Sequence, residues 1–292
     1  MILMSMGVLA WQRTYQVSVD VQTTDSVPTL SIVATIYPLQ DFAQAIGGEQ
    51  AWVRGIVPLG MEPHEYEPSP QDIVRMYQAD IVLFNGAGID AWAEKIRPAL
   101  ETRGVTVLRM SDIGDVSDMD PHFWLDPVWA IEAVTAIERA LILRDPEHTK
   151  VYTDNADRYK NLLVQIDTEY RQGLRQCASH TVATSHNALW YLAERYGFSV
   201  LPISPIVPDT EASPRALVES IEEIRTLGLQ YVMYETLDGP RVADSIAQET
   251  GVMTLSFNAL EGLTVAEVSA GKNYISVMRD NLHNLQTVLQ CQ

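Results

Sequence analysis

Three histidines of the 292-residue chain lie just beyond a candidate strand or in a loop rich in turn residues. His64 lies in GMEPHEYEPSPQD, His122 in MDPHFWLDP and His186 in VATSHNALWYLAERYG. Neutral imidazole is a common ligand of divalent transition metals, and the aromatic residues that follow His122 would favour the neutral form by excluding water. Each histidine alone could equally be an ordinary loop residue. Three in separate loops indicate a metal site, provided that the fold brings them together.

A carboxylate could complete such a site, and two glutamates are placed to supply it. Glu235 ends a candidate strand at 230–235, and Glu261 follows another at 253–257. Three imidazoles and one carboxylate make a closed, four-coordinate site that suits Zn²⁺, whereas Mn²⁺ prefers more oxygen ligands. The remaining histidines are expected at the surface: His148, His180 and His283.

An acidic run precedes His122 and could concentrate cations near it. Its members are Asp112, Asp115, Asp118 and Asp120. Runs of like charge are usually solvated, so we expect an ordinary exposed loop here.

The charge and the cysteine content of the chain exclude some classes of partner and cofactor. Asp and Glu number 38 against 20 Lys and Arg, which gives a formal net charge of −18. A nucleic-acid partner is therefore not expected, because phosphate backbones require positive surface. Cationic ligands fit this charge, although the acidity could also serve solubility alone. The two cysteines, Cys177 and Cys291, exclude a Cys-rich zinc or iron–sulfur protein and could be two buried thiols or one disulfide.

The elements that must position these side chains form two similar series of short, mostly apolar strands with intervening helices. Runs of this kind are typical of parallel sheets covered on both faces. The sequence thus predicts an α/β fold of two four-stranded lobes. The candidate strands are 30–36, 51–57, 80–86 and 105–110 in the first series, and 181–185, 199–203, 230–235 and 253–257 in the second.

One long helical pattern, 145–175, separates the two series and has no Pro or Gly from 147 to 172. Thirty helical residues would extend about 45 Å, enough to bridge both lobes. The expected organisation is an N-terminal lobe at 29–143, a linking helix at 144–177 and a C-terminal lobe at 178–292.

The beginning of the chain has a different character. Residues 1–11 are apolar and uncharged, too few to span a bilayer but as long as the core of a signal peptide. We interpret 1–28 as an export or anchor segment followed by a polar tether, with an artefactual start as the alternative.

The motifs resemble those of the solute-binding receptors of ABC transporters for zinc and manganese, over essentially all of 29–292. The matching segments are IVATIYPLQDFAQAIGG, VPLGMEPHEYEPSPQDI, ADIVLFNGAGIDAW, DPHFWLDP, ATSHNALWYLAERYG, SPRALVESIEEIRTLGLQYVMYE and GKNYISVMRDNLHNL. The resemblance implies two α/β lobes joined by one backbone helix, with the metal between them.

The resemblance also implies the roles of individual residues. The metal ligands would be His64, His122, His186 and Glu261, while Glu235 would orient a histidine through its other ring nitrogen. Manganese members usually carry a carboxylate at the third position, where this chain has His186, so a zinc-type member is expected. Two features depart from the family pattern: the loop before His122 is short and acidic instead of His-rich, and no lipid-attachment cysteine follows the apolar N-terminus.

The implied function is that of a monomeric extracytoplasmic receptor, which captures Zn²⁺ and delivers it to a membrane permease with its ATPase. Export makes a disulfide between Cys177 and Cys291 the expected state, since each ends a helix. The alternatives are a manganese receptor, a surface adhesin and a zinc hydrolase. A hydrolase usually keeps an open metal position for water, which four protein ligands would not leave, so no enzyme activity is expected.

Overall fold

Eight parallel strands form two four-stranded sheets in the computed structural model, which describes residues 30–116, 120–203 and 214–292. The first sheet has the order β2-β1-β3-β4 and the second has the order β6-β5-β7-β8. The predicted α/β class with two (βα)4 lobes is confirmed. The strands are β1 (Leu30–Ala34), β2 (Ala51–Gly55), β3 (Ile81–Phe84), β4 (Thr106–Arg109), β5 (Thr181–Thr184), β6 (Ser199–Pro202), β7 (Tyr231–Glu235) and β8 (Met253–Phe257).

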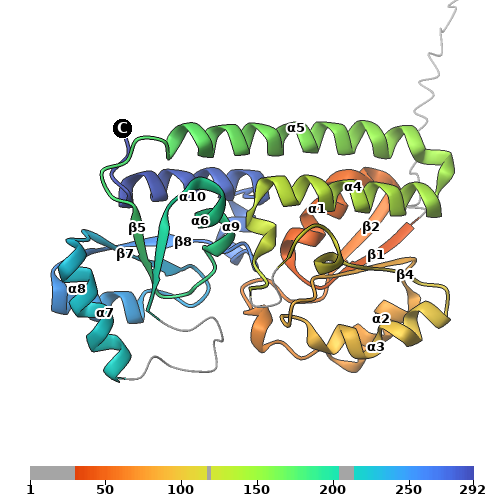
Figure 1. Cartoon of the computed structure of the whole chain (residues 1–292). Coiled ribbons are helices and arrows are strands. Elements are labelled where there is room, and N and C mark those ends of the chain that lie inside the picture. The colour runs from red at the N-terminus through yellow and green to blue at the C-terminus, as the bar shows by residue number, and fades with distance from the viewer. Residues whose placement is uncertain (1–29, 117–119, 204–213) are drawn as a thin grey trace, which may run out of the picture.

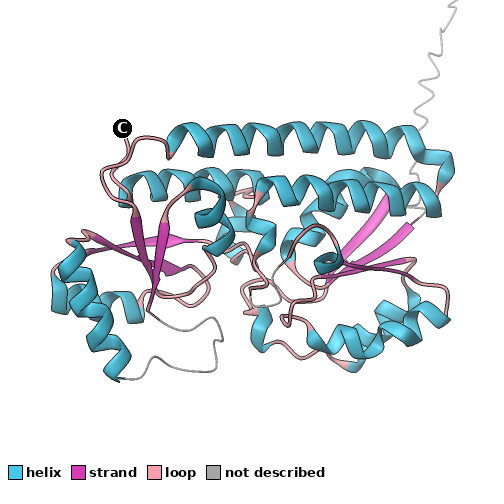
Figure 2. Cartoon of the chain, in the orientation of Figure 1, coloured by secondary structure: helices cyan, strands magenta, loops and turns pink. Residues whose placement is uncertain are grey.

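Helices cover both faces of each sheet (Figure 2). Their starts follow from local sequence: Ser69 caps α2 through the backbone N–H of Asp72, and Asp126 caps α4 through the N–H of Val128. The helices beside the first sheet are α1 (Tyr37–Gly47), α2 (Pro70–Gln78), α3 (Ala91–Thr102) and α4 (Pro127–Arg144). Those beside the second are α6 (Trp190–Tyr196), α7 (Pro214–Leu227), α8 (Arg241–Thr250), α9 (Val265–Ser269) and α10 (Tyr274–Val288).

The predicted bridging helix is α5 (Thr149–Gly173), which follows a 3-10 turn at Pro146–His148. It runs along one side of both halves of the molecule, beside α4 in the first and α10 in the second (Figure 1). Lys160 pairs with Glu138 of α4, and the hydroxyl of Tyr170 donates to the carbonyl of Met278 in α10. The helix is therefore held by contacts to both halves along its length.

A single apolar core continues from one half into the other. It contains Phe42 of α1, Trp124 and Tyr159 from the middle of the chain, and Leu192 and Tyr274 from the second half. Two smaller clusters lie on the outer sides of the sheets, one around Val82 and Met76 and one around Val232 and Ile246. The two halves thus pack directly against each other, beyond their connection through α5.

The predicted export segment and tether at 1–28 lie outside the described residues. Within the described ranges, no helix combines the length and the apolar character that crossing a membrane requires.

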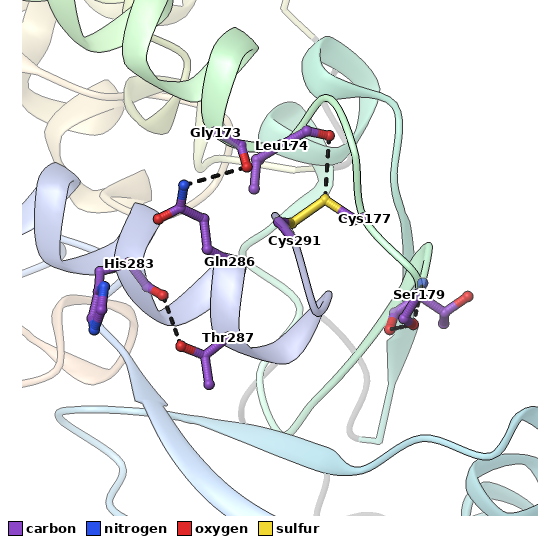
Figure 3. Close-up of a disulfide and its surroundings, with 9 residues drawn as sticks. Gly173, Leu174, Cys177, Ser179, His283, Gln286, Thr287 and Cys291 are labelled. Atoms are coloured by element: carbon purple, nitrogen blue, oxygen red, sulfur yellow. Dashed lines mark hydrogen bonds between the residues drawn. A yellow bond between two sulfur atoms is a disulfide. The ribbon is translucent and has the colours of Figure 1, made fainter.

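Cys177 and Cys291 are joined by a disulfide (Figure 3). The bond lies where the chain leaves α5 and where α10 ends, 114 residues apart in sequence. Backbone hydrogen bonds reinforce the junction, from Ala178 to Gln290 and from Gln292 to Gln176. The disulfide therefore ties the last residues of the chain to the end of the bridging helix.

Replacing both cysteines by Ser should lower the free energy of unfolding by about 2–4 kcal/mol, because a long loop in the unfolded chain is no longer closed. Urea unfolding of the wild-type protein and the double variant would measure this difference. The wild-type protein unfolded with a reductant present should match the variant. Equal midpoints without reductant would show that the disulfide does not stabilise the fold.

Candidate metal centre

Four side chains that are far apart in sequence meet between the two sheets: His64, His122, His186 and Glu261. One ligand atom from each lies within 4.8 Å of the others. Two of the residues come from the first half of the chain and two from the second. The structure therefore brings together all four side chains that the sequence singled out as ligands.

Four of the separations between these ligand atoms are close to those of a tetrahedral metal site. From the Nε2 atom of His122, the Nε2 atoms of His64 and His186 lie at 3.4 Å and 3.2 Å. The Oε1 atom of Glu261 lies 3.4 Å from His64 and 3.5 Å from His186. Ligands bonded at 2.0–2.2 Å around a tetrahedral ion stand about 3.3–3.6 Å apart. Only the contact between His122 and Glu261 is shorter, 2.7 Å, as a direct hydrogen bond requires.

His64 is presented by a short 3-10 turn, Pro63–Glu65, between β2 and α2. The side chain of Glu62 caps this turn by accepting from the backbone N–H of His64 at 3.1 Å. The side chain of His64 is 12% exposed, whereas that of His122 is fully buried. His64 therefore lies on the solvent side of the group.

His122 is fixed by a carboxylate two residues before it. Asp120 Oδ1 accepts from the backbone N–H of His122 at 2.8 Å and from its ring Nδ1 at 2.7 Å. Because a carboxylate can only accept, Nδ1 carries a proton and Nε2 faces the other three side chains. The carbonyl of Pro121 accepts from the side chain of Asn85, which follows β3. The loop is thereby anchored to the end of the sheet.

His186 follows β5, a central strand of the second sheet. The backbone N–H of Ser185 still donates to Met233 of β7, and the hydroxyl of Thr184 donates to the carbonyl of His186. These bonds turn the chain at the carboxyl end of the strand, where ligands of open α/β sheets bind. The Oδ2 atom of Asp238 lies 3.9 Å from Nδ1 of His186, beyond hydrogen-bond distance.

Glu261 lies on a tight turn after β8. Asn258 accepts from the backbone N–H of Leu260 at 2.7 Å, and Leu260 has a φ of 60°. This left-handed conformation is rare for a branched residue, and here it reverses the chain so that the next side chain points back between the sheets. The carboxyl group of Glu261 is fully buried.

Glu235 has a different role from the expected one. Its carboxylate accepts from the backbone N–H groups of Leu237, Asp238 and Ala259, and no histidine ring nitrogen is among its partners in the described residues. The expectation that Glu235 orients a histidine was therefore wrong. Glu235 instead connects the loop after β7 to the turn that carries Glu261. Both segments follow the ends of strands, where backbone N–H groups have no partner in the sheet and can donate to a side chain.

Asp120 is the functional partner that sequence reasoning missed. We expected the acidic run to be solvated, and Asp112 fits that expectation because it is exposed and pairs with Arg109. Asp120 is only 3% exposed and holds His122, while Asp118 lies outside the described residues. A signal was present: an Asp two residues before a His can accept that residue's backbone N–H in an Asx turn.

The other histidines stand apart from the group. His180 and His283 are exposed, as expected. His148 is half-buried instead of fully exposed, because its Nδ1 lies 2.7 Å from Asp145 at the start of α5.

Burial and charge act in opposite directions on the two most deeply buried members. Burial alone lowers the pKa of His122, but its hydrogen bonds and charge interactions with Asp120 and Glu261 raise it to about 9. Burial raises the pKa of Glu261, but its hydrogen bond with His122 and its close contacts with His186 and His64 hold it well below its usual range. The metal-free site therefore contains an ionised carboxylate beside an imidazolium.

The buried carboxylate of Glu261 also lies beside the carboxyl group of Glu62, whose pKa is raised to about 10 by burial and by the charge of Glu261 and its hydrogen bond to it. A buried ionised carboxylate is costly unless positive charge or hydrogen bonds compensate it. A metal cation would supply that charge, so the donor set fits a divalent ion.

Two α/β lobes bridged by one long helix, with a group of three histidines and one glutamate between them, define the class of two-lobed metal-binding proteins with a helical backbone. The family model for ZnuA, described as zinc-uptake complex component A, periplasmic, matches residues 32–288, so the chain belongs to this family.

Known relatives agree in sequence and in structure. The zinc-binding lipoprotein AdcA of Streptococcus pneumoniae is 32% identical over 276 residues, which cover 88% of this chain and 55% of AdcA. The chain thus spans about half the length of that relative.

Two solved structures have the same fold, each with a TM-score of 0.80, and each match covers 89% of this chain and 99% of the other. The Zn(II)-bound ZnuA-like domain of AdcA from Streptococcus pneumoniae is 33% identical. The laminin-binding protein Lbp of Streptococcus pyogenes is 32% identical.

Metal binding should release a proton from His122. With a pKa of about 9, its ring is protonated at neutral pH in the metal-free protein and must become neutral to bind an ion. The apparent affinity for Zn²⁺ should therefore rise with pH, by up to about tenfold per unit, and level off above about pH 9. Calorimetry at about pH 7.5 in buffers of different ionisation enthalpy would count the protons.

Asp120→Asn provides the matched comparison, because it removes a negative charge that raises the pKa of His122. This variant should release fewer protons at the same pH and bind Zn²⁺ about 10–100-fold more weakly. Zinc binding without proton release in the wild-type protein would contradict the assignment of a protonated His122.

Proposed function

We propose that this protein is an extracytoplasmic receptor that captures Zn²⁺ between its two lobes for delivery to a membrane permease. The observation that carries the proposal is the convergence of three imidazole nitrogens and one carboxylate oxygen within 4.8 Å of one another, with four of the separations at 3.2–3.5 Å. The proposed ligands are His64, His122, His186 and Glu261. A set with three nitrogens and one carboxylate oxygen favours Zn²⁺ over Mn²⁺.

A closed donor set supports transport rather than catalysis. Four protein ligands fill a tetrahedral shell, so a hydrolytic water would have no position on the ion. The proposed ion also contacts both halves, two ligands from each, which suits a cargo held between lobes. We propose 29–143 and 178–292 as these lobes and 144–177 as the link between them.

The relatives support the same proposal. AdcA is named as a zinc-binding lipoprotein, and the family is described as a zinc-uptake component. We infer a permease with its ATPase as the partner, a location outside the cytoplasm, and a monomeric receptor. Lbp is named for laminin binding, so adhesion is a second role to test, by binding of the purified protein to immobilised laminin with and without Zn²⁺.

Replacing one proposed ligand should weaken Zn²⁺ binding strongly. His122→Ala and His186→Ala each remove a buried nitrogen donor, while Glu261→Ala should cost less, because water can take the fourth position. Competition with a chromophoric chelator would give the affinities, and native mass spectrometry would give the stoichiometry of one ion per chain. Saturating Zn²⁺ at about 100 times the dissociation constant should stabilise the wild-type fold by about 2.7 kcal/mol.

His283→Ala is the matched control, since it removes an exposed imidazole of α10 that lies outside the group. It should bind Zn²⁺ as the wild-type protein does. Undiminished affinity in His122→Ala and His186→Ala would reject the proposed site. Tighter binding of Mn²⁺ than of Zn²⁺ by the wild-type protein would reject zinc as the cargo.

A further inference from the structure

The indole of Trp124 connects the two loops that carry His122 and Glu261. Trp124 is fully buried, and its ring lies edge-to-face against the ring of His122, with centroids 5.2 Å apart. Its Nε1–H donates to the carbonyl of Ala259 at 2.8 Å, two residues before Glu261. One side chain of the first half therefore contacts one proposed ligand and hydrogen bonds to the backbone that presents another.

The peptide that receives this bond is held firmly within its own half. Ala259 donates its N–H to Glu235 at 3.1 Å, and the preceding residue, Asn258, exchanges hydrogen bonds with Asn281 of α10. The turn at Asn258–Glu261 is thus nearly rigid relative to the second half of the chain. It can move away from His122 mainly when the whole second half moves. The bond from Trp124 opposes that movement, because it ties the turn to the other half.

Trp124 is itself fixed from the second half. Its backbone carbonyl accepts from the hydroxyl of Tyr274 at 2.5 Å, and Tyr274 is fully buried at the beginning of α10. Trp124 thus donates to one segment of the second half and accepts from another. Two buried bonds of this kind define a spacing between the halves more sharply than apolar contacts, which are not directional.

We propose that Trp124 is a positioning residue that sets the spacing between His122 and Glu261 and thereby favours a small tetrahedral ion over a larger one. This proposal rests on the proposed zinc site. With the bond intact, the carboxylate oxygen of Glu261 stays 2.7–3.5 Å from the ring nitrogens of the three imidazoles. Without it, the carbonyl of Ala259 loses its donor, and the second half, together with the turn, gains freedom to shift relative to His122. The carboxylate can then move outward, and water can enter the shell, as Mn²⁺ prefers.

The test is Trp124→Phe, which keeps an aromatic ring beside His122 but removes the indole donor. Its matched control is Trp129→Phe. Trp129 is also buried, and its Nε1–H donates to the carbonyl of Ile113 at 2.9 Å, within the first half. Each variant loses one indole–carbonyl bond, so general losses of stability should be similar. The measurements are the dissociation constants for Zn²⁺ and Mn²⁺ and the visible absorption of the Co²⁺ complex.

Trp124→Phe should bind Zn²⁺ about 10–100-fold more weakly, the usual effect of losing a residue that orients a ligand. Mn²⁺ binding should change less, so the preference for Zn²⁺ should shrink. The Co²⁺ complex should lose the strong visible bands of four-coordinate cobalt. Trp129→Phe should leave the metal preference and the spectrum as in the wild-type protein. An unchanged preference and spectrum in Trp124→Phe would overturn the proposal.

Tyr274→Phe keeps the test decisive if Trp124→Phe does not fold. It removes the hydroxyl that holds the Trp124 carbonyl and should shift the metal preference and the Co²⁺ spectrum in the same direction, by a smaller factor. Unchanged values there would also overturn the proposal. A wild-type protein that binds no Zn²⁺ would instead reject the proposed function.

Discussion

A fully buried carboxylate that stays ionised is the constraint on which the rest of the site depends. Glu261 has no contact with solvent, yet three imidazoles keep its pKa well below the usual range. A charge in this environment requires close compensation, because a protein interior screens charge far less than water does. The histidines must therefore be held at the carboxylate, and their loops are shaped for that purpose: Asp120 fixes His122, and a left-handed residue turns Glu261 inward.

The shared apolar core allows loops from two separate sheets to maintain such short distances. Side chains of α1, of the segment around Trp124 and of α10 pack into one cluster, and α5 is bound along both halves. Domain pairs that touch through small polar interfaces are expected to move against each other. Here the interface is apolar and continuous with the core of each half, so the ligand positions are set largely before an ion arrives.

The sequence was sufficient to predict the architecture, because its signals are local. Short runs such as 81–84 are apolar on both faces, as buried parallel strands must be, and the Ser-Pro at 69–70 and Asp-Pro at 126–127 mark helix starts. The ends of the predicted strands, and the loops that follow them, also pointed to the four residues of the proposed metal site. What could not be predicted were the partners of those residues: Asp120 looked like any acid of a charged loop, and Glu235 was assigned to the wrong kind of partner. Both depend on contacts between loops that lie far apart in sequence.

The four side chains that would surround an ion differ in their exposure to solvent, so one side of the site is more open than the others. The side chains of His122 and Glu261 are fully buried and that of His186 is 6% exposed, whereas that of His64 is 12% exposed. Of the four side chains, His64 is therefore the one most open to solvent. Ligand exchange that began at His64, on the short turn at Pro63–Glu65, would leave the three more buried donors in place.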